Sequence, residues 1–134
     1  YPDRTVIAVT GDGGFQMTSQ ELAIAAIHNI PVKIALLNNR TLGMVRQWQQ
    51  LFHGGRYSQV DLSGSPDFVK LAEAYGVRGM RATTPAEAEA AWAEALRHPG
   101  PALVEFVIPA EENVYPMVAP GAGLDEMIMG EDEA

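Results

Sequence analysis

Two short polar motifs carry the residue types that could do chemistry in this chain. The first, Gly11-Asp12-Gly13-Gly14, follows an apolar run, and the second, Asn38-Asn39, follows the next apolar run. Glycines let backbone N–H groups come close to an anion, whereas the Asp12 carboxylate would repel a bare phosphate. Carboxylate and amide oxygens are hard ligands of the kind that Mg²⁺ takes, with substrate phosphates completing the octahedron. The residues alone therefore predict a Mg²⁺-bridged diphosphate site.

Each motif by itself has a plainer explanation. A Gly-Asp-Gly-Gly sequence after a strand is often only a tight turn, and Asn-Asn is ordinary loop chemistry. The combination favours a site, because ligands of open parallel sheets bind outside the carboxyl ends of the strands. The glycines do not form the dinucleotide-binding fingerprint, since the third glycine is missing at its required spacing.

The elements that must position these motifs alternate between strand and helix. Apolar runs without polar alternation predict strands that are covered on both faces, at residues 5–9, 32–37, 77–81 and 102–108. Capping signals and apolar stripes predict helices at residues 18–28, 43–52, 65–76 and 84–98, beginning at Thr18, Gly43, Ser65 and Thr84. This alternation is typical of an α/β fold with a doubly wound, mostly parallel sheet and helices on both faces.

Composition excludes several classes of protein. The 134 residues are 47% apolar and 19% charged, which indicates one globular domain and not a disordered chain. We see no apolar run that approaches the roughly 20 residues of a membrane span, and no signal peptide. The absence of cysteine excludes disulfides, thiolate zinc sites, iron–sulfur clusters and cysteine nucleophiles. We expect a cytoplasmic protein that does not bind a membrane.

The net charge of −8 comes almost entirely from the C-terminal end, because the residues after 109 hold seven acids and no Lys or Arg. The first 109 residues carry ten acids against nine bases. A protein that follows nucleic-acid phosphates needs a basic face, so we expect no nucleic-acid binding. We divide the chain here into an α/β domain (1–109) and an acidic C-terminal arm or frayed tail (110–134). The loop at 53–64 is Gly-rich and polar.

The motifs also resemble a known family. GDG, some two dozen residues and then NN are typical of thiamine-diphosphate enzymes, and residues 11–52, 66–81 and 100–128 closely resemble the catalytic large subunit of acetolactate synthases. Within that class, the segments GMVRQWQ and NVYPMVAPGAGLDEMI are specific to acetolactate synthases. The resemblance identifies the chain as the C-terminal, diphosphate-binding domain of such a subunit, with its first strand expected before Tyr1.

The resemblance implies a metal site and a cofactor site. Asp12, Asn39 and the backbone carbonyl of Thr41 match the family's Mg²⁺ ligands, and two diphosphate oxygens and a water would complete six ligands. The positions that match the family's contacts to thiamine diphosphate are Asp12, Gly13, Gly14, Asn39, Gly43 and Met44.

Met44 and Trp48 match positions that shape the pocket for the second substrate. Without the resemblance, their spacing of four residues is explained equally well by packing on a helix. Arg46 and Gln47 fit either a contact with a substrate carboxylate or an exposed helix face. The Glu111-Glu112 pair is interpreted as a solvated turn.

The resemblance further implies decarboxylation of pyruvate and its ligation to a second 2-oxo acid, which gives 2-acetolactate, or 2-aceto-2-hydroxybutyrate from 2-oxobutyrate, in branched-chain amino-acid biosynthesis. Family members are several hundred residues long, and a middle domain, not this segment, holds FAD. They form homodimers or larger assemblies with shared active sites, and a regulatory small subunit is a possible partner. The glutamate that activates the cofactor lies on another domain, so no catalytic residue is assigned here and the isolated chain is expected to be inactive.

Two alternatives stay open at this point. A related thiamine-diphosphate carboligase, oxidase or decarboxylase would keep Asp12 and Asn39 but need not keep GMVRQWQ. A stand-alone, non-catalytic Mg²⁺–diphosphate-binding module would keep the same two residues without the rest of the enzyme.

Overall fold

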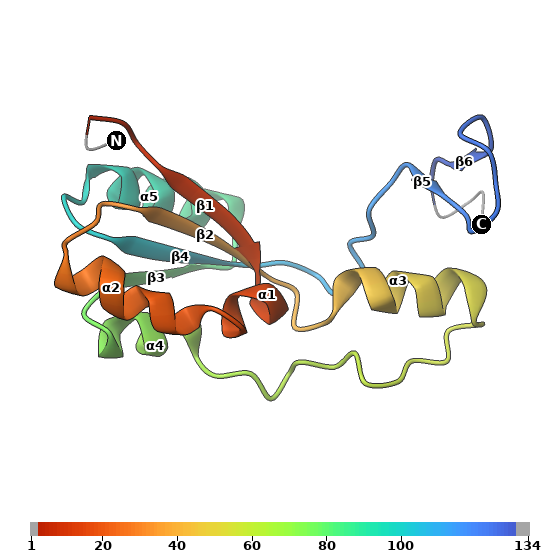
Figure 1. Ribbon diagram of the computed structural model, residues 1–134, viewed down its shortest axis with the longest axis horizontal. Coiled ribbons are helices and arrows are strands. Elements are labelled where there is room, and N and C mark those ends of the chain that lie inside the picture. Colours follow the sequence, from red (N-terminus) through yellow and green to blue (C-terminus); the bar gives the residue numbers. More distant parts are fainter. Residues whose placement is uncertain (1–2, 131–134) are drawn as a thin grey trace.

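The computed structural model describes residues 3–130, which form an open sheet of four parallel strands with helices on both faces (Figure 1). The order across the sheet is β1-β2-β4-β3. This arrangement confirms the predicted α/β fold with a mostly parallel sheet. The strands are β1 (Ile7–Gly11), β2 (Lys33–Asn38), β3 (Arg78–Ala82) and β4 (Ala102–Val107).

Helices make most of the connections between these strands. They begin close to the strand ends, so the carboxyl edge of the sheet is also where several helices start. The segments are α1 (Asp12–Gln16), the 3₁₀ turn η1 (Ser19–Glu21), α2 (Leu22–Ile27), α3 (Gly43–Phe52), α4 (Phe68–Ala74) and α5 (Pro85–Arg97).

The single helix predicted from Thr18 is wrong in its first turn. Thr18 makes no side-chain capping bond, and its φ of −133° and ψ of 11° are not the extended geometry of an N-cap. Its N–H instead donates to the Phe15 carbonyl at 3.0 Å, which completes the end of α1. A 3₁₀ turn therefore comes first, and the α-helix begins only at Leu22.

The cap predicted for α4 is displaced by two residues. Asp67, not Ser65, is the N-cap, and its carboxylate accepts from the N–H groups of Val69 and Lys70. The Ser65 hydroxyl accepts a bond from Gln16 Nε2 at 2.7 Å. A charged acceptor at the N-cap also favours the positive end of the helix dipole. The capping box predicted at Thr84 is confirmed, with Glu87 and a proline in the first turn.

Each face of the sheet is buried against a different set of helices. On one face, α1, α2 and α4 enclose a cluster made by Phe15, Leu22, Ile34, Leu36, Phe68, Ala72, Val77 and Leu103. On the other face, α5 covers β3 and β4 through Met80, Ala95, Ala102 and Val104. The alternation of Leu103 with Ala102 and Val104 shows how β4 serves both cores. Side chains of β1 on the α5 side stay open, with Ile7 48% and Val9 69% exposed.

The arm after residue 109 leaves the sheet and lies on the same side of the molecule as α3, which projects away from the main body (Figure 1). It contains a short antiparallel pair, β5 (Met117–Val118) with β6 (Met127–Ile128). Residues 131–134, where three of the acids lie, fall outside the described residues. Within residues 3–130, no helix combines the length and apolar character needed to cross a membrane.

Replacement of Phe68 is expected to lower the free energy of unfolding more than a substitution at an exposed residue of the arm. Phe68 is fully buried and meets Phe15 edge-to-face at 5.7 Å between ring centroids. We expect Phe68→Ala to cost about 3–5 kcal/mol in the free energy of unfolding, measured by guanidinium denaturation. Leu124→Ala, at a side chain that is 78% exposed, is the control and should change it by less than about 0.5 kcal/mol. Equal losses in the two variants would contradict the core assignment.

Candidate functional site

The pairing of β1 with β2 brings the two polar motifs together. The strands run parallel in a register that pairs Gly11 with Leu37, so Asp12 and Asn38 both follow at the same edge of the sheet. Helix α1 begins directly at Asp12. The predicted neighbourhood of the two motifs at the carboxyl ends of adjacent strands is therefore present in the fold.

A cavity of about 330 Å³ opens at this edge. Its walls come from the β1–α1 turn, the loop after β2, the first turns of α3 and the start of the arm. Thr41, the predicted backbone ligand, lines it. So do all the positions for which the sequence predicted a cofactor contact, namely Asp12, Gly13, Gly14, Asn39, Gly43 and Met44.

Asp12 is the electrostatic centre of the cavity. Its side chain is almost fully buried, with 2% exposure, and its Oδ2 atom has no hydrogen-bond partner among the described residues. Burial raises the pKa of this carboxyl, and the charge of Glu105 raises it further, while backbone N–H groups of Gly13, Asp12 and Arg40 lower it. A buried carboxylate with a free oxygen is costly unless a cation pairs with it.

The two asparagines in the loop after β2 have different roles. Asn38 points into the fold, where its Nδ2 donates to Glu105 Oε1 at 2.6 Å and its Oδ1 accepts from the Arg40 N–H at 3.0 Å. The Oδ1 atom of Asn39 accepts from the Thr41 N–H at 3.1 Å, and Asn39 lines the cavity. The first asparagine thus anchors the loop, and the second faces the site.

The glycines of the site make room for neighbouring side chains. A Cβ atom at Gly43 would lie 2.9 Å from Asn39 Nδ2, closer than real contacts allow. A Cβ atom at Gly13 would lie 3.0 Å from a methyl carbon of Leu42 and 3.2 Å from one of Leu62. Gly43 is therefore needed so that Asn39 can keep its place, a reason that the sequence pattern did not provide.

The side chains and backbone around the cavity could supply part of the ligand set of a hard divalent cation, with the remaining oxygens coming from phosphate and water. Within the described part of the chain, no three His, Cys, Asp or Glu side chains come together as a metal-binding group. Three residues that could supply a carboxylate (Asp12), an amide oxygen (Asn39) and a backbone carbonyl (Thr41) line one cavity instead. Such a partial set suits Mg²⁺, which usually binds through one or two carboxylates together with phosphate oxygens and water.

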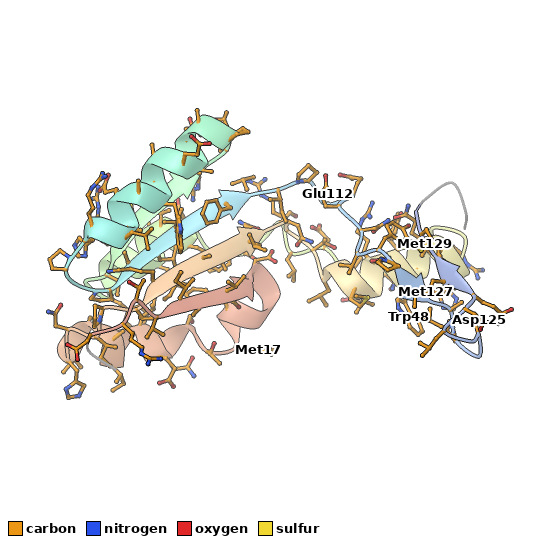
Figure 2. The ribbon with its side chains drawn as sticks, turned by 90° about the horizontal axis from the view of Figure 1, so that it is seen from above. Met17, Trp48, Glu112, Asp125, Met127 and Met129 are labelled. Atoms are coloured by element: carbon orange, nitrogen blue, oxygen red, sulfur yellow. The ribbon has the colours of Figure 1, made fainter. Side chains whose placement is uncertain are left out.

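The two predicted substrate-pocket residues on α3 are placed differently. Met44 lines the cavity and is 51% exposed. Trp48 is not among the cavity-lining residues; it packs edge-to-face on Phe52, with 5.6 Å between ring centroids, and is 40% exposed. Figure 2 shows Trp48 on α3, well away from the sheet. A role for Trp48 in the substrate pocket stays a prediction.

Sequence reasoning missed part of the cavity wall. Glu112 and Val114 from the arm line it, as does Gln47 from α3. The exposed-face interpretation of Gln47 is wrong, because this side chain is 1% exposed and bonds to the backbone of Val114. No local sequence pattern predicts a hydrogen-bond partner that lies 67 residues further along the chain. Arg46 Nη2 lies 3.6 Å from Glu111 Oε1. The Glu111 side chain is largely exposed, as the interpretation of the Glu111-Glu112 pair as a solvated turn expects.

Asp12→Asn is expected to make the metal-free protein more stable at neutral pH. Folded Asp12 keeps its proton to a higher pH than in the unfolded chain, so stability falls as pH rises above about 4. The asparagine variant carries no such charge, so its midpoint of thermal unfolding should exceed that of the wild type at pH 7 and approach it near pH 4.

Asp67→Asn provides the opposite control. The backbone N–H of Lys70 and the guanidinium of Arg81 lower the pKa of Asp67, so its ionised form stabilises the fold above about pH 4. That variant should lose stability at pH 7. The same sign of change in both variants would contradict our account of Asp12.

The chain is similar to known proteins over most of its length. Residues 1–106 match the family described as thiamine pyrophosphate enzyme, C-terminal TPP binding domain. The chain is 51% identical over 128 residues to a probable acetolactate synthase large subunit of Methanocaldococcus jannaschii. It is 46% identical over 127 residues to the acetolactate synthase isozyme 2 large subunit of Escherichia coli. These alignments cover 95% of this chain but only 21% and 23% of the relatives.

A solved structure shares the fold. The thiamine diphosphate-dependent 4-hydroxybenzoylformate decarboxylase of Rhodococcus jostii superposes with a TM-score of 0.75 and 38% sequence identity, over 81% of this chain and 20% of that one. The chain thus spans about a fifth of the length of the proteins that it matches. On the family match over most of its length, and with the two polar motifs gathered at one cavity, the chain belongs to the C-terminal TPP-binding domain family of thiamine pyrophosphate enzymes.

Proposed function

We propose that this chain is the C-terminal, cofactor-binding domain of an acetolactate synthase large subunit. The observation that carries the proposal is the buried Oδ2 atom of Asp12, which has no partner among residues 3–130 and lies in a cavity that Asn39 also lines. Identity of 42–51% to acetolactate synthase large subunits over about 95% of the chain supports the choice of this enzyme within the wider class.

In this proposal the chain holds the diphosphate end of the cofactor. Asp12, Asn39 and the Thr41 carbonyl would bind Mg²⁺, and the backbone at Gly13 and Gly14 would hold the diphosphate. Neutralisation by the ion would remove the cost of burying Asp12. When bound, thiamine diphosphate supplies an electron sink for decarboxylation and a nucleophilic carbon for joining two 2-oxo acids.

The proposed reaction consumes pyruvate and either a second pyruvate or 2-oxobutyrate, in branched-chain amino-acid biosynthesis. The residue that activates the cofactor would come from another domain of a neighbouring subunit, so the enzyme would be a homodimer or larger. FAD would bind outside this segment, a regulatory small subunit would be a further partner, and the location would be cytoplasmic. Exposed apolar side chains on α3, among them Met44 and Val45, leave that helix with area for a subunit contact.

The test compares the longest natural protein that carries this chain with the 134-residue chain alone. Acetolactate formed from pyruvate is measured with Mg²⁺ and thiamine diphosphate present or omitted. We expect product only from the long form, only with both cofactors, and none after Asp12→Ala. A different product from pyruvate would favour a related carboligase, oxidase or decarboxylase. Cofactor binding without turnover in a natural protein of this length would favour the binding module.

Trp48→Leu is expected to change acceptor choice without abolishing acetolactate formation. A pocket wall that contacts one extra methylene contributes about 1–3 kcal/mol to discrimination, so the preference for 2-oxobutyrate over pyruvate should fall by roughly tenfold. The measurement is the product ratio in a competition between the two acceptors, which does not depend on how much enzyme is folded. Trp92→Leu, on the far helix α5, is the control and should keep the wild-type ratio. An unchanged ratio in Trp48→Leu would remove this residue from the pocket.

A further inference from the structure

A single glutamine on α3 joins the two walls of the cavity. The Gln47 side chain pairs with the backbone of Val114 through two hydrogen bonds: Val114 N–H donates to Oε1 at 2.9 Å, and Nε2 donates to the Val114 carbonyl at 2.9 Å. The second Nε2 hydrogen points to Met117 Sδ at 3.1 Å. The side-chain amide thus bonds to Val114 as a paired backbone strand would, and it uses both of its donor hydrogens.

Two bonds to the backbone of one arm residue distinguish this contact from the Asn113–Gln50 bond and the Arg46–Glu111 pair. The Gln47 side chain is 1% exposed and Val114 is 59% exposed, so the bonds between them are partly buried. The Asn113–Gln50 contact is a bond between two side chains at 3.2 Å. Arg46 Nη2 and Glu111 Oε1 lie 3.6 Å apart, and the Glu111 side chain is 73% exposed. Exposed ion pairs contribute little, whereas a buried amide that loses its partners leaves unsatisfied groups. Of these three contacts, the one made by Gln47 combines a buried side chain with two bonds to the arm backbone.

The position of this contact links it to the cavity. Gln47 and Val114 both line the cavity that holds Asp12 and Asn39, and Met44 lies one turn earlier on the same helix. Figure 1 shows the arm leaving β4 and passing above α3 on its way to β5. Release of Val114 would open the cavity on the arm side.

Helix α3 holds a second segment by the same means, which gives a matched comparison. The side chain of Gln49 also pairs with one backbone residue: the Ser58 N–H donates to Oε1 at 3.0 Å, and Nε2 donates to the Ser58 carbonyl at 3.0 Å. Ser58 belongs to the loop after α3, not to the arm, and it is not among the cavity-lining residues. Substitution of Gln49 removes the same kind of contact without touching the arm.

We propose that Gln47 is a positioning residue that holds the arm at Val114 and so closes the arm side of the cavity. The docking of the arm stands on the geometry of this chain alone. The consequence for cofactor retention rests on the proposed function. In that setting, Gln47 acts through the arm and does not touch the reacting atoms.

The first test measures hydrogen–deuterium exchange in the full-length protein without cofactor. Loss of two hydrogen bonds, each worth a factor of about 2–10 in equilibrium, should make the segment 112–118 of Gln47→Leu exchange at least about tenfold faster than in the wild type. Gln49→Leu should loosen 56–60 and leave 112–118 unchanged. Unchanged protection of 112–118 in Gln47→Leu, with the rest of the protein folded, overturns the proposal.

The second test uses a variant whose pairing depends on pH. In Gln47→Glu, the protonated acid can accept from the Val114 N–H and donate to the Val114 carbonyl, as the amide does. The ionised form has no donor and repels that carbonyl. Burial raises the pKa of a carboxyl at this position above its ordinary value of about 4.3. Compared with the wild type at each pH, the segment 112–118 should therefore be protected at pH 4 and loose at pH 8. A structural defect unrelated to the pairing would give the same difference at both values, which would also overturn the proposal.

The third measurement separates this inference from the proposed function. With Mg²⁺ present, thiamine diphosphate should dissociate from Gln47→Leu at least several-fold faster than from the wild type, and at the wild-type rate from Gln49→Leu. Failure of the wild type to bind thiamine diphosphate contradicts the proposed function and leaves the exchange result standing. Faster arm exchange with an unchanged dissociation rate contradicts the closure of the cavity.

Discussion

A buried carboxylate without a counter-charge is the constraint around which this domain is arranged. Asp12 is 2% exposed, one of its oxygens has no partner within residues 3–130, and burial raises its pKa. Folding alone gives no reason to hold such a group, because a neutral residue would be less costly there. The parallel β1–β2 pairing places it beside the loop that carries Asn39. Under the proposed function, a bound cation would offset this electrostatic cost.

Behind this unsatisfied group lies a satisfied network. Glu105, on the central strand β4, is 2% exposed and accepts from Asn38 at 2.6 Å and from Arg81 Nε at 2.7 Å. Arg81 continues to the α4 cap residue, Asp67, at 2.8 Å. The network fixes the first asparagine of the pair, and the geometry of the second follows from it through the turn to Thr41. One charged chain of contacts therefore runs along the carboxyl edge from the site to a helix start.

Local and periodic signals in the sequence predicted the sheet, the site motifs and the capping box at Thr84, because each depends on residues close in the chain. The cap at Asp67 and the 3₁₀ turn after Thr18 were missed, because Ser65 bonds to Gln16 and Thr18 bonds to Phe15 instead of capping the next helix. Likewise, glutamine is a residue type that usually lies on the surface, and the burial of Gln47 is explained by its hydrogen bonds to Val114. Contacts across long stretches of chain have no local signature, so the walls of the cavity were the least predictable part.

Helix α3 shows why such contacts collect in one element. It projects from the sheet (Figure 1) and has little core beneath it, so apolar burial alone cannot fix its neighbours. Two pairs of hydrogen bonds fix these neighbours instead. Gln47 bonds to the backbone of Val114, and Gln49 bonds to the backbone of Ser58. Hydrogen bonds to backbone groups do not depend on the side chains of the bound segment. The arm and the loop can therefore change in sequence at these points while α3 still holds them in register with the cavity.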